Sequence, residues 1–253
     1  MSSDKSQKNL TKGKNRTSGR NSQGKLVVRH RGGGHKRKER VVDFDRTDKE
    51  GITGKVESID YDPNRTADIA KVLYEDGERR YIIAPEEMDE GDEVITKEDG
   101  PLEVGNRVRL KNIPSGIEVY NVELKPGKGG QLSRSAGTSL QVLANEEGYT
   151  HLRMPSDEIR KVPWNCWGSI GSVSNAEHSS ETMNKAGDAR HRGERPEVRG
   201  AAMGAHDHPG GGGEGGQQTW GSDTPKDVYG NKTKGKTRKN KRSDDLIIKR
   251  RNE

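Results

Sequence analysis

Short apolar runs separated by turn residues mark the middle of the chain as β-rich. Between about residues 52 and 124 these runs read GKVESIDYD, TADIAKVLY, RRYIIAP, DEVIT, NRVRL and GIEVYNVEL. The pair Asp76-Gly77 separates two of them, and Asp-Gly between β-type segments is a hairpin signal. Five or six strands at this close spacing predict a small barrel or sandwich with one shared core.

A second group of short runs follows a glycine- and serine-rich basic linker, PGKGGQLSRSAGTS. This group reads LQVLANE, YTHLRMP, EIRKVP and CWGSIGSV. It predicts a second small barrel from about Leu140 to Val173, with Trp164 and Trp167 in its core or at its lip. Beyond Ser174 roughly 80 residues carry few large apolar side chains, which predicts disorder or folding on a partner. The fold class is therefore mainly β.

The distribution of charge points to a polyanionic partner. Hydrophobic residues make up only 26% of the chain and charged residues 34%, with a net charge of +6. Residues 1–40 hold 13 Lys and Arg against 2 Asp and Glu, residues 41–100 hold 8 against 19, and residues 222–253 hold 11 against 5. Basic ends flanking a compact module favour nucleic acid over a membrane surface.

The strongest local signal is RHRGGGHKRKER at residues 29–40, where cations flank three glycines. Arg and Lys neutralise phosphates and release counterions, and the glycines let the backbone run along a groove or another strand. A solvated basic tail or a localisation signal is the alternative. The embedded glycines and two histidines favour a binding arm.

A second unusual stretch, RGAAMGAHDHPGGGGEGG, begins at Arg199. Its histidines and carboxylates are metal-ligand types, but His-x-His without further ligands is a weak zinc signal. No Lys-Ser or Lys-Thr pair follows the glycines, so a nucleotide-phosphate loop is disfavoured. We therefore predict neither a metal nor a cofactor. In a competing interpretation His208, oriented by Asp207, is a general acid or base, but no core surrounds the pair to fix its geometry.

The single cysteine, Cys166, excludes an internal disulfide framework and a cysteine-based zinc knuckle, which favours a reducing compartment. No apolar run approaches the roughly 18 residues of a membrane span. These two observations favour a cytoplasmic chain with no membrane partner.

Six motifs occur in order from Gly19 onward: GRNSQGKLVVRHRGGGHKR, YDPNRTADIA, DGERRYIIAP, ELKPGKGGQLSRSAGTS, KAGDARHRGERPEVRGAAM and DHPGGGGEG. Together they resemble the universal ribosomal protein L-two family of the large subunit. The family usually reads MNPVDHPHGGGEG in the last region. Here Gly210 stands in place of the second histidine of that pattern, and His206 is an additional one.

The resemblance implies an N-terminal OB-like barrel followed by an SH3-like barrel, with long irregular basic and glycine-rich extensions at both ends. The implied divisions are a basic RNA-binding arm at 1–40, the OB-like barrel at 41–124, the linker at 125–139, the SH3-like barrel with its extension at 140–198, and the glycine-rich loop with a basic tail at 199–253.

The implied function is that of a non-enzymatic structural constituent of the large ribosomal subunit, in the cytoplasm or an organelle. It would bind rRNA directly, support subunit assembly and association, and place its His/Gly-rich loop near the peptidyl transferase region. The implied partners are rRNA, neighbouring ribosomal proteins and the small subunit across the interface, and the protein is not expected to be an obligate homo-oligomer. A general single-stranded nucleic-acid binder is the third interpretation.

The basic pattern and the resemblance together give a set of predicted RNA-binding residues. They are Arg29, His30, Arg31, Gly32, Gly33, Gly34, His35, Lys36, Arg37, Lys38, Lys125, Lys128, Arg134, Arg199, Met203, Asp207, His208, Gly211, Gly212, Gly213, Glu214, Lys234, Lys236, Arg238 and Lys239.

Overall fold

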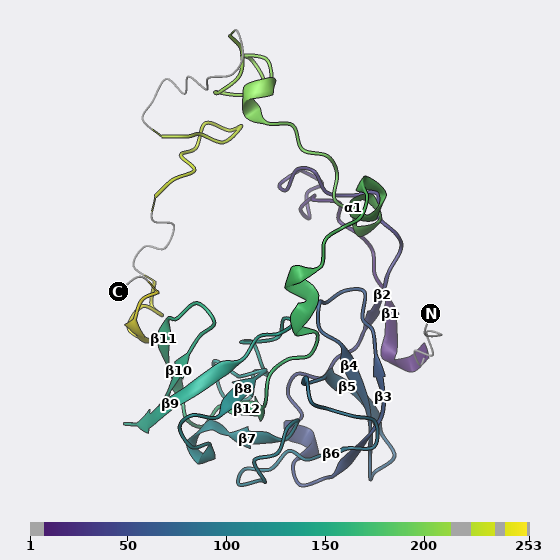
Figure 1. The fold of residues 1–253 in the computed structure, drawn as a ribbon, viewed down its shortest axis with the longest axis vertical. Helices are drawn as coiled ribbons and strands as arrows, with labels where there is room; N and C mark the ends of the chain where they lie inside the picture. Colours follow the sequence, from purple (N-terminus) through teal and green to yellow (C-terminus); the bar gives the residue numbers. More distant parts are fainter. Residues whose placement is uncertain (1–7, 214–223, 236–240, 252–253) are drawn as a thin grey trace. The chain divides into compact units, whose positions relative to one another are not determined.

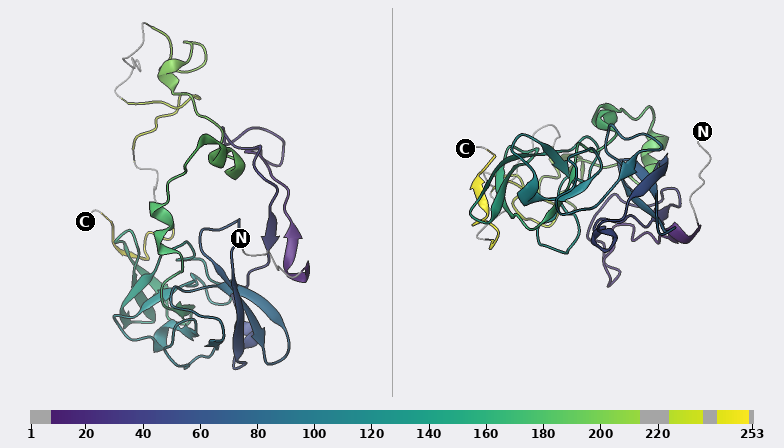
Figure 2. Two further views of the ribbon diagram at one scale, coloured as in Figure 1. Left: turned by 45° about the vertical axis from the view of Figure 1, so that its right-hand side comes forward. Right: turned by 90° about the horizontal axis from the view of Figure 1, so that it is seen from below.

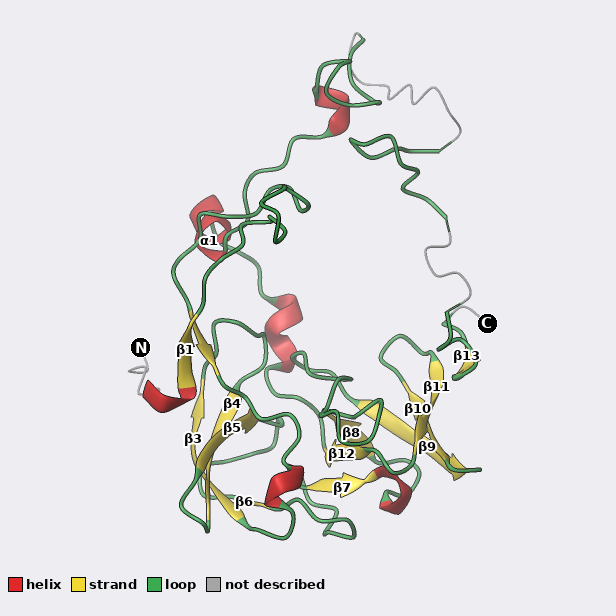
Figure 3. Ribbon diagram, turned by 180° about the vertical axis from the view of Figure 1, so that it is seen from behind, coloured by secondary structure: helices red, strands yellow, loops and turns green. Residues whose placement is uncertain are grey.

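The computed structural model describes residues 8–213, 224–235 and 241–251. The chain divides into two compact units (Figure 1). Unit 1 comprises Met1–Asn15, Lys36–Thr182 and Ser243–Glu253, and unit 2 comprises Arg16–His35 and Met183–Arg242. All the strands belong to unit 1, and the described residues form one α-helix (Figure 3). The predicted mainly β fold class is confirmed.

A four-stranded antiparallel sheet forms the first part of unit 1. Its strands lie in the order β5-β4-β3-β6. They are β3 (Gly54–Asp60), β4 (Ile69–Tyr74), β5 (Arg79–Ile83) and β6 (Glu93–Val94). The predicted hairpin turn joins β4 to β5, because Gly77 has φ +81° and donates its N–H to the Tyr74 carbonyl at 2.9 Å. Apolar side chains from all four strands, among them Val56, Val72, Ile82 and Val94, share one buried cluster.

A seven-stranded antiparallel sheet forms the second part of unit 1, in the order β13-β11-β10-β9-β8-β12-β7 (Figure 1). The strands are β7 (Arg107–Arg109), β8 (Glu118–Tyr120), β9 (Leu140–Glu146), β10 (Tyr149–Arg153), β11 (Ile159–Pro163), β12 (Trp167–Ile170) and β13 (Ile247–Lys249). Trp167 is buried and Trp164 is 37% exposed, so one lies in the core and the other at the surface.

The predicted grouping of strands is wrong for β7 and β8. Their apolar runs were placed in the first barrel, but β8 pairs with β9 and β12, and β7 pairs with β12. Val108 and Val119 accordingly share a buried cluster with Leu140, Val142 and Leu152 of the later strands. The other edge of β7 still touches the first barrel, because its Arg107 exchanges backbone hydrogen bonds with residues 95 and 97.

A buried ion pair stabilises the second sheet. Arg107 and Glu123 are both fully buried, and a guanidinium nitrogen lies 3.2 Å from Glu123 Oε1. The same carboxylate accepts the backbone N–H groups of Gly129 and Trp167, each at 3.2 Å. Burial, and after it the charge of Arg46, lowers the pKa of Arg107 to about 10. Each oxygen of the carboxylate therefore has a donor, as a buried charge requires.

The single cysteine lies in this second core. Cys166 is buried between β11 and β12, as expected for a small core residue. Burial, and after it the Glu123 carboxylate, raises the pKa of its thiol to about 12. No helix in the described part of the chain has the length and apolar character needed to cross a membrane.

The remaining regular structure of unit 1 is short. Strands β1 (Thr11–Gly13) and β2 (Lys38–Arg40) pair with each other alone, at the root of the basic arm (Figure 2). The four 3-10 helices of this unit among the described residues are η1 (Lys8–Leu10), η2 (Thr47–Lys49), η3 (Leu110–Asn112) and η4 (Ala176–Ser180).

Unit 2 contains regular structure that the sequence pattern did not predict. Helix α1 (Ala186–Arg192) ends at Gly193, whose φ of +95° is left-handed, and η5 (Gly200–Ala202) begins the glycine-rich loop. Asp188 in the first turn of α1 and three basic residues in its last turn complement the helix dipole. Glu194 donates its N–H to the Ala189 carbonyl at 3.0 Å, so the helix end is capped without a packed core.

Candidate nucleic-acid interface

The basic arm of unit 2 pairs along its backbone with the segment that follows α1. Gly32 donates its N–H to the Gly193 carbonyl at 2.8 Å, and Arg195 donates to the His30 carbonyl at 3.0 Å. Between these bonds Arg31 and Glu194 form an antiparallel bridge and an ion pair at 2.8 Å. Two basic stretches more than 160 residues apart in sequence therefore lie side by side.

Glycine at position 34 is required by this pairing. A Cβ atom there would lie 2.7 Å from both the Gly193 nitrogen and the His191 carbonyl oxygen. Real Cβ atoms do not approach backbone so closely, and neither neighbour can move away without breaking the pairing. Gly33, with φ +69°, lies against the Arg190 guanidinium. Gly34 thus allows a second backbone to approach, as predicted for this glycine-containing segment.

The pairing brings the predicted Arg29 together with cations that were not among the predicted site residues. The guanidinium of Arg16 donates to the His35 carbonyl, and Arg29 donates to His30 Nε2 at 3.1 Å. Three further arginines come from α1 and the residues after it: Arg190, Arg192 and Arg195. The closely spaced arginines in DARHRGER could have indicated a binding segment. Their charge alone did not show which other segment of the chain they would pair with.

Two arginines share an aromatic face in unit 1. Arg65 lies 5.5 Å and Arg134 lies 4.5 Å from the ring centroid of Phe44, the single phenylalanine of the chain. All three line a pocket with Asn64 and Ser133. Burial, and after it the charge of Arg65, lowers the pKa of Arg134. Arg65 pairs with the buried Asp62 carboxylate at 2.9 Å through its Nε. Its remaining guanidinium nitrogens lie over the same ring as Arg134, so Arg65 joins the predicted Arg134 as a candidate phosphate ligand.

The other predicted cations have different surroundings. Arg37, which belongs to unit 1, donates to the Pro63 carbonyl of the same unit at 2.6 Å. Five predicted lysines are exposed at the surface of their own unit: Lys36, Lys38, Lys125, Lys128 and Lys234. Four predicted residues lie outside the described part of the chain: Glu214, Lys236, Arg238 and Lys239.

The glycine-rich loop of unit 2 closes on itself. Gly212 donates its N–H to the Met203 carbonyl at 3.0 Å, and Gly211 donates to the His208 carbonyl at 2.9 Å. A Cβ atom at Gly211 would lie 2.3 Å from the Gly204 carbonyl oxygen, so only glycine fits there. Gly212 and Gly213 have φ values of +81° and +83°. The backbone bonds therefore give the loop a defined turn.

His208 is held inside this loop. Its ring lies against Gly200, where an added Cβ would come within 2.4 Å of the ring atoms. The Gly210 N–H donates to His208 Nδ1 at 3.0 Å. Because a backbone N–H can only donate, Nδ1 is the acceptor, and a neutral ring carries its proton on Nε2. His208 therefore presents a donor, and Asp207, which is exposed, does not hold Nδ1.

Within the described ranges, no group of three or more His, Cys, Asp or Glu side chains is arranged to hold a metal ion.

Two family models match the chain. The model for Ribosomal Proteins L2, RNA binding N-terminal domain, matches residues 7–96, and that for Ribosomal Proteins L2, C-terminal domain, matches residues 103–230. The chain belongs to the ribosomal protein L2 family. Large ribosomal subunit protein uL2 of Alcanivorax borkumensis is 53% identical over 241 residues, covering 95% of this chain and 87% of that protein. The protein of the same name from Thioalkalivibrio sulfidiphilus is 52% identical over 244 residues, covering 96% and 88%.

Membership of the L2 family agrees with the fold. The four-stranded sheet is the OB-like barrel, and the seven-stranded sheet is the SH3-like barrel that follows it. The C-terminal model begins at residue 103, ahead of β7, which matches the pairing of β7 with the later strands. The role of each predicted RNA-binding residue stays a prediction.

Proposed function

We propose that this L2 family protein is a structural constituent of the large ribosomal subunit that binds rRNA directly. The observation that carries the proposal is the pairing of residues 29–35 with residues 191–195. It concentrates arginines and histidines from two distant segments on one narrow double-stranded element. Such an element fits between phosphate backbones, where each cation that replaces a counterion contributes to affinity.

The barrels and the extension have separate roles in this proposal. The barrels supply fixed cationic positions such as the Arg65 and Arg134 pair on Phe44. The arm and the glycine-rich loop of unit 2 insert among rRNA segments and hold them together during subunit assembly. Neighbouring ribosomal proteins and the small subunit are further partners, and the ribosome in the cytoplasm is the site of action.

The closed loop is the part proposed to approach the peptidyl transferase region. Its backbone bonds between Met203 and Gly212 fix where His208 points. The Nε2–H of a neutral ring can donate to a phosphate or a ribose hydroxyl. His208 would then position RNA and would not transfer protons.

The test compares the full-length protein on structured large-subunit rRNA fragments and on unstructured oligonucleotides of equal length. We expect tighter binding to the structured fragments and co-sedimentation with large subunits at high salt. Equal affinity for both RNAs would identify a general single-strand binder and refute the ribosomal proposal.

The first prediction concerns His208. We expect subunits carrying His208→Gln, which keeps a donor, to assemble and to form peptide bonds at near wild-type rates. A general acid or base typically contributes a hundredfold or more, and glutamine cannot replace it. The measurement is single-turnover peptide-bond formation by purified subunits with complete occupancy of the protein. A loss of about a hundredfold would favour catalysis instead.

The second prediction concerns the arginine pair on Phe44. Replacing both Arg65 and Arg134 by Gln is expected to weaken rRNA binding and to lower the slope of log K against log[salt] by roughly 1.4 to 1.8, because two phosphate contacts are lost. Filter binding over a salt series measures both quantities. Arg153→Gln is the control, since it removes one exposed arginine that is not part of this pair. An unchanged slope in the double variant would show that the pair has no phosphate ligand.

A further inference from the structure

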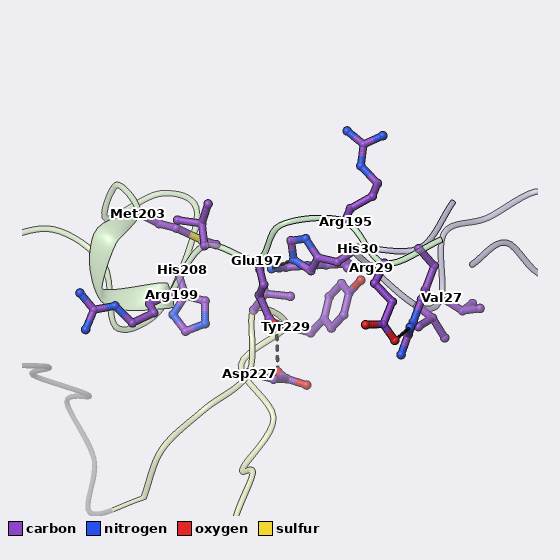
Figure 4. Close-up of a pocket in the computed structure, with 16 residues that line it drawn as sticks. Val27, Arg29, His30, Arg195, Glu197, Arg199, Met203, His208, Asp227 and Tyr229 are labelled. Carbon is purple, nitrogen blue, oxygen red and sulfur yellow. Dashed lines mark hydrogen bonds and ion pairs between the residues drawn. The ribbon is translucent and has the colours of Figure 1, made fainter. Parts of the chain in front are cut away.

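An open pocket of about 600 Å³ lies within unit 2, and its walls come from three segments of the chain (Figure 4). The segments are residues 27–31 of the arm, residues 194–208 before and within the loop, and residues 227–229 of a C-terminal hairpin. This volume lies in the range of sites that hold a small molecule or a nucleotide. The pocket shares Arg29, His30, Arg31, Arg195 and His208 with the candidate interface described above, which does not use its apolar residues or Tyr229.

One wall of the pocket is apolar and exposed. Val27 is 57% exposed, and Val28 and Val198 are each more than half exposed. Tyr229 is 66% exposed, and Figure 4 shows its ring among the side chains that line the pocket. Isolated apolar residues at a surface need no explanation, but a cluster drawn from three segments marks a binding site.

The hairpin that carries Tyr229 is fixed by hydrogen bonds. Asp227 Oδ1 accepts the backbone N–H groups of Tyr229 at 2.9 Å and of Asn231 at 2.8 Å. Gly230, with φ +82°, donates its N–H to the Asp227 carbonyl at 3.0 Å. The Asp227 carboxylate therefore stabilises the turn, and the turn fixes the backbone that carries the Tyr229 ring.

Arginines outnumber carboxylates among the residues that line the pocket, four to three. Arg29, Arg195 and Arg199 line it, and none of the three has an ion-pair partner among the residues that the structure describes. Arg31 is neutralised by Glu194 at 2.8 Å. Glu197 supplies a carboxylate acceptor. A pocket lined by exposed valines, a tyrosine ring and guanidinium groups matches a ligand with a flat ring and a phosphate.

We propose that this pocket binds one unstacked nucleobase of the rRNA, with Tyr229 as its stacking surface, the valines as its apolar wall and the arginines on the flanking phosphates. The inference rests on the proposed rRNA binding and adds a site for a base to it. Single-stranded bases of RNA are recognised by stacking on aromatic rings and by hydrogen bonds to their edges. Glu197 is an acceptor for the amino or imino group at such an edge.

An apolar side chain of another protein is the competing occupant. Such an interface would not need three uncompensated arginines, because guanidinium groups without a partner are costly to bury against an apolar surface. A nucleotide would place its base against the apolar and aromatic wall and its phosphates near the arginines. The observations therefore favour RNA.

The test uses the full-length protein and complete, protein-free large-subunit rRNA as the probe. Tyr229→Ala is expected to weaken binding by about tenfold or more while leaving the slope of log K against log[salt] unchanged, because a stacked base and not a phosphate contact is lost. Tyr229→Phe keeps the ring and should bind like the wild type. Val27→Thr combined with Val28→Thr keeps the shape of the wall but not its apolar character, and should weaken binding several-fold.

Base-specific chemical probing of the bound rRNA identifies the occupant. We expect one nucleotide that is protected by the wild type and by Tyr229→Phe and is reactive with Tyr229→Ala. Leu102→Ala removes an apolar residue that is 41% exposed in unit 1 and is the matched control, expected to change nothing.

The outcomes separate this inference from the proposed function. Wild-type affinity and protection in Tyr229→Ala would overturn the base pocket while leaving rRNA binding intact. Loss of a neighbouring protein from assembled Tyr229→Ala subunits, with unchanged rRNA binding, would overturn it in favour of a protein partner. Failure of the wild type to prefer structured rRNA would instead refute the proposed function itself.

Discussion

Replacing Arg16–His35 with a four-residue Gly/Ser linker is expected to weaken rRNA binding by about a hundredfold or more at physiological salt. The replaced segment holds five Lys and Arg residues and no Asp or Glu. Each phosphate contact contributes roughly 0.7 to 0.9 to the salt slope, so up to about 4 units of slope should disappear. The two flanking strands remain paired, because Gly13 lies opposite Lys38 in β1 and β2 and a short linker can join them.

The measurement is the dissociation constant for large-subunit rRNA over a salt series. A second variant keeps the length of the Arg16–His35 segment and its five cations but has Gly or Ser at every other position. It distinguishes the effect of the charges from the effect of the folded backbone. We expect it to retain much of the slope and to bind less tightly than the wild type, because the backbone pairing of Gly32 and His35 is no longer supported by its surroundings. Full affinity and full slope in the linker variant would identify the arm as a tail without a binding role.

The largest loss of stability is expected from Glu123→Ala. Removing this carboxylate leaves the Arg107 charge buried without its counterion and leaves the N–H groups of Gly129 and Trp167 without an acceptor. Breaking a buried pair on one side costs about 3–5 kcal/mol, a large fraction of the stability of an ordinary domain. The SH3-like barrel should therefore unfold at a much lower urea concentration.

Urea unfolding followed by tryptophan fluorescence measures this effect at neutral pH. The double replacement Arg107→Met with Glu123→Leu removes both charges and should recover much of the lost stability, as apolar pairs of similar volume often do. Glu123→Gln keeps an acceptor and is expected to fall between the wild type and Glu123→Ala. A single replacement that left the unfolding midpoint unchanged would contradict a structural role for the pair.

The local pattern predicted the strands well but not their partners. All ten apolar runs became strands, because alternation and turn residues such as Asp76-Gly77 act over a few residues. The runs around Val108 and Val119 were assigned to the nearer barrel, since nothing in a short run specifies a partner about 20 to 60 residues away. Their pairing is decided by which apolar cluster they complete, and that is a property of the folded chain.

The candidate site could be predicted from the sequence where basic residues and glycines lie together in one segment. Residues 29–35 carry both signals, whereas Arg65 becomes a candidate only because Phe44 and Arg134 fold against it. Helix α1 was not predicted because its residues form no apolar stripe, and none of them is buried. Its stability comes from charges at its ends and from Gly193, and these signals are individually small.

The buried thiol of Cys166 has a practical consequence for spectroscopy. A thiol with a pKa near 12 and no exposed surface does not supply the thiolate that maleimide and iodoacetamide reagents attack. Because this is the only cysteine in the chain, any cysteine added at an exposed position would be the sole reactive one. The native protein is therefore already a suitable background for single-site fluorophores and spin labels, and motion of the arm could be followed during assembly without first removing a core side chain.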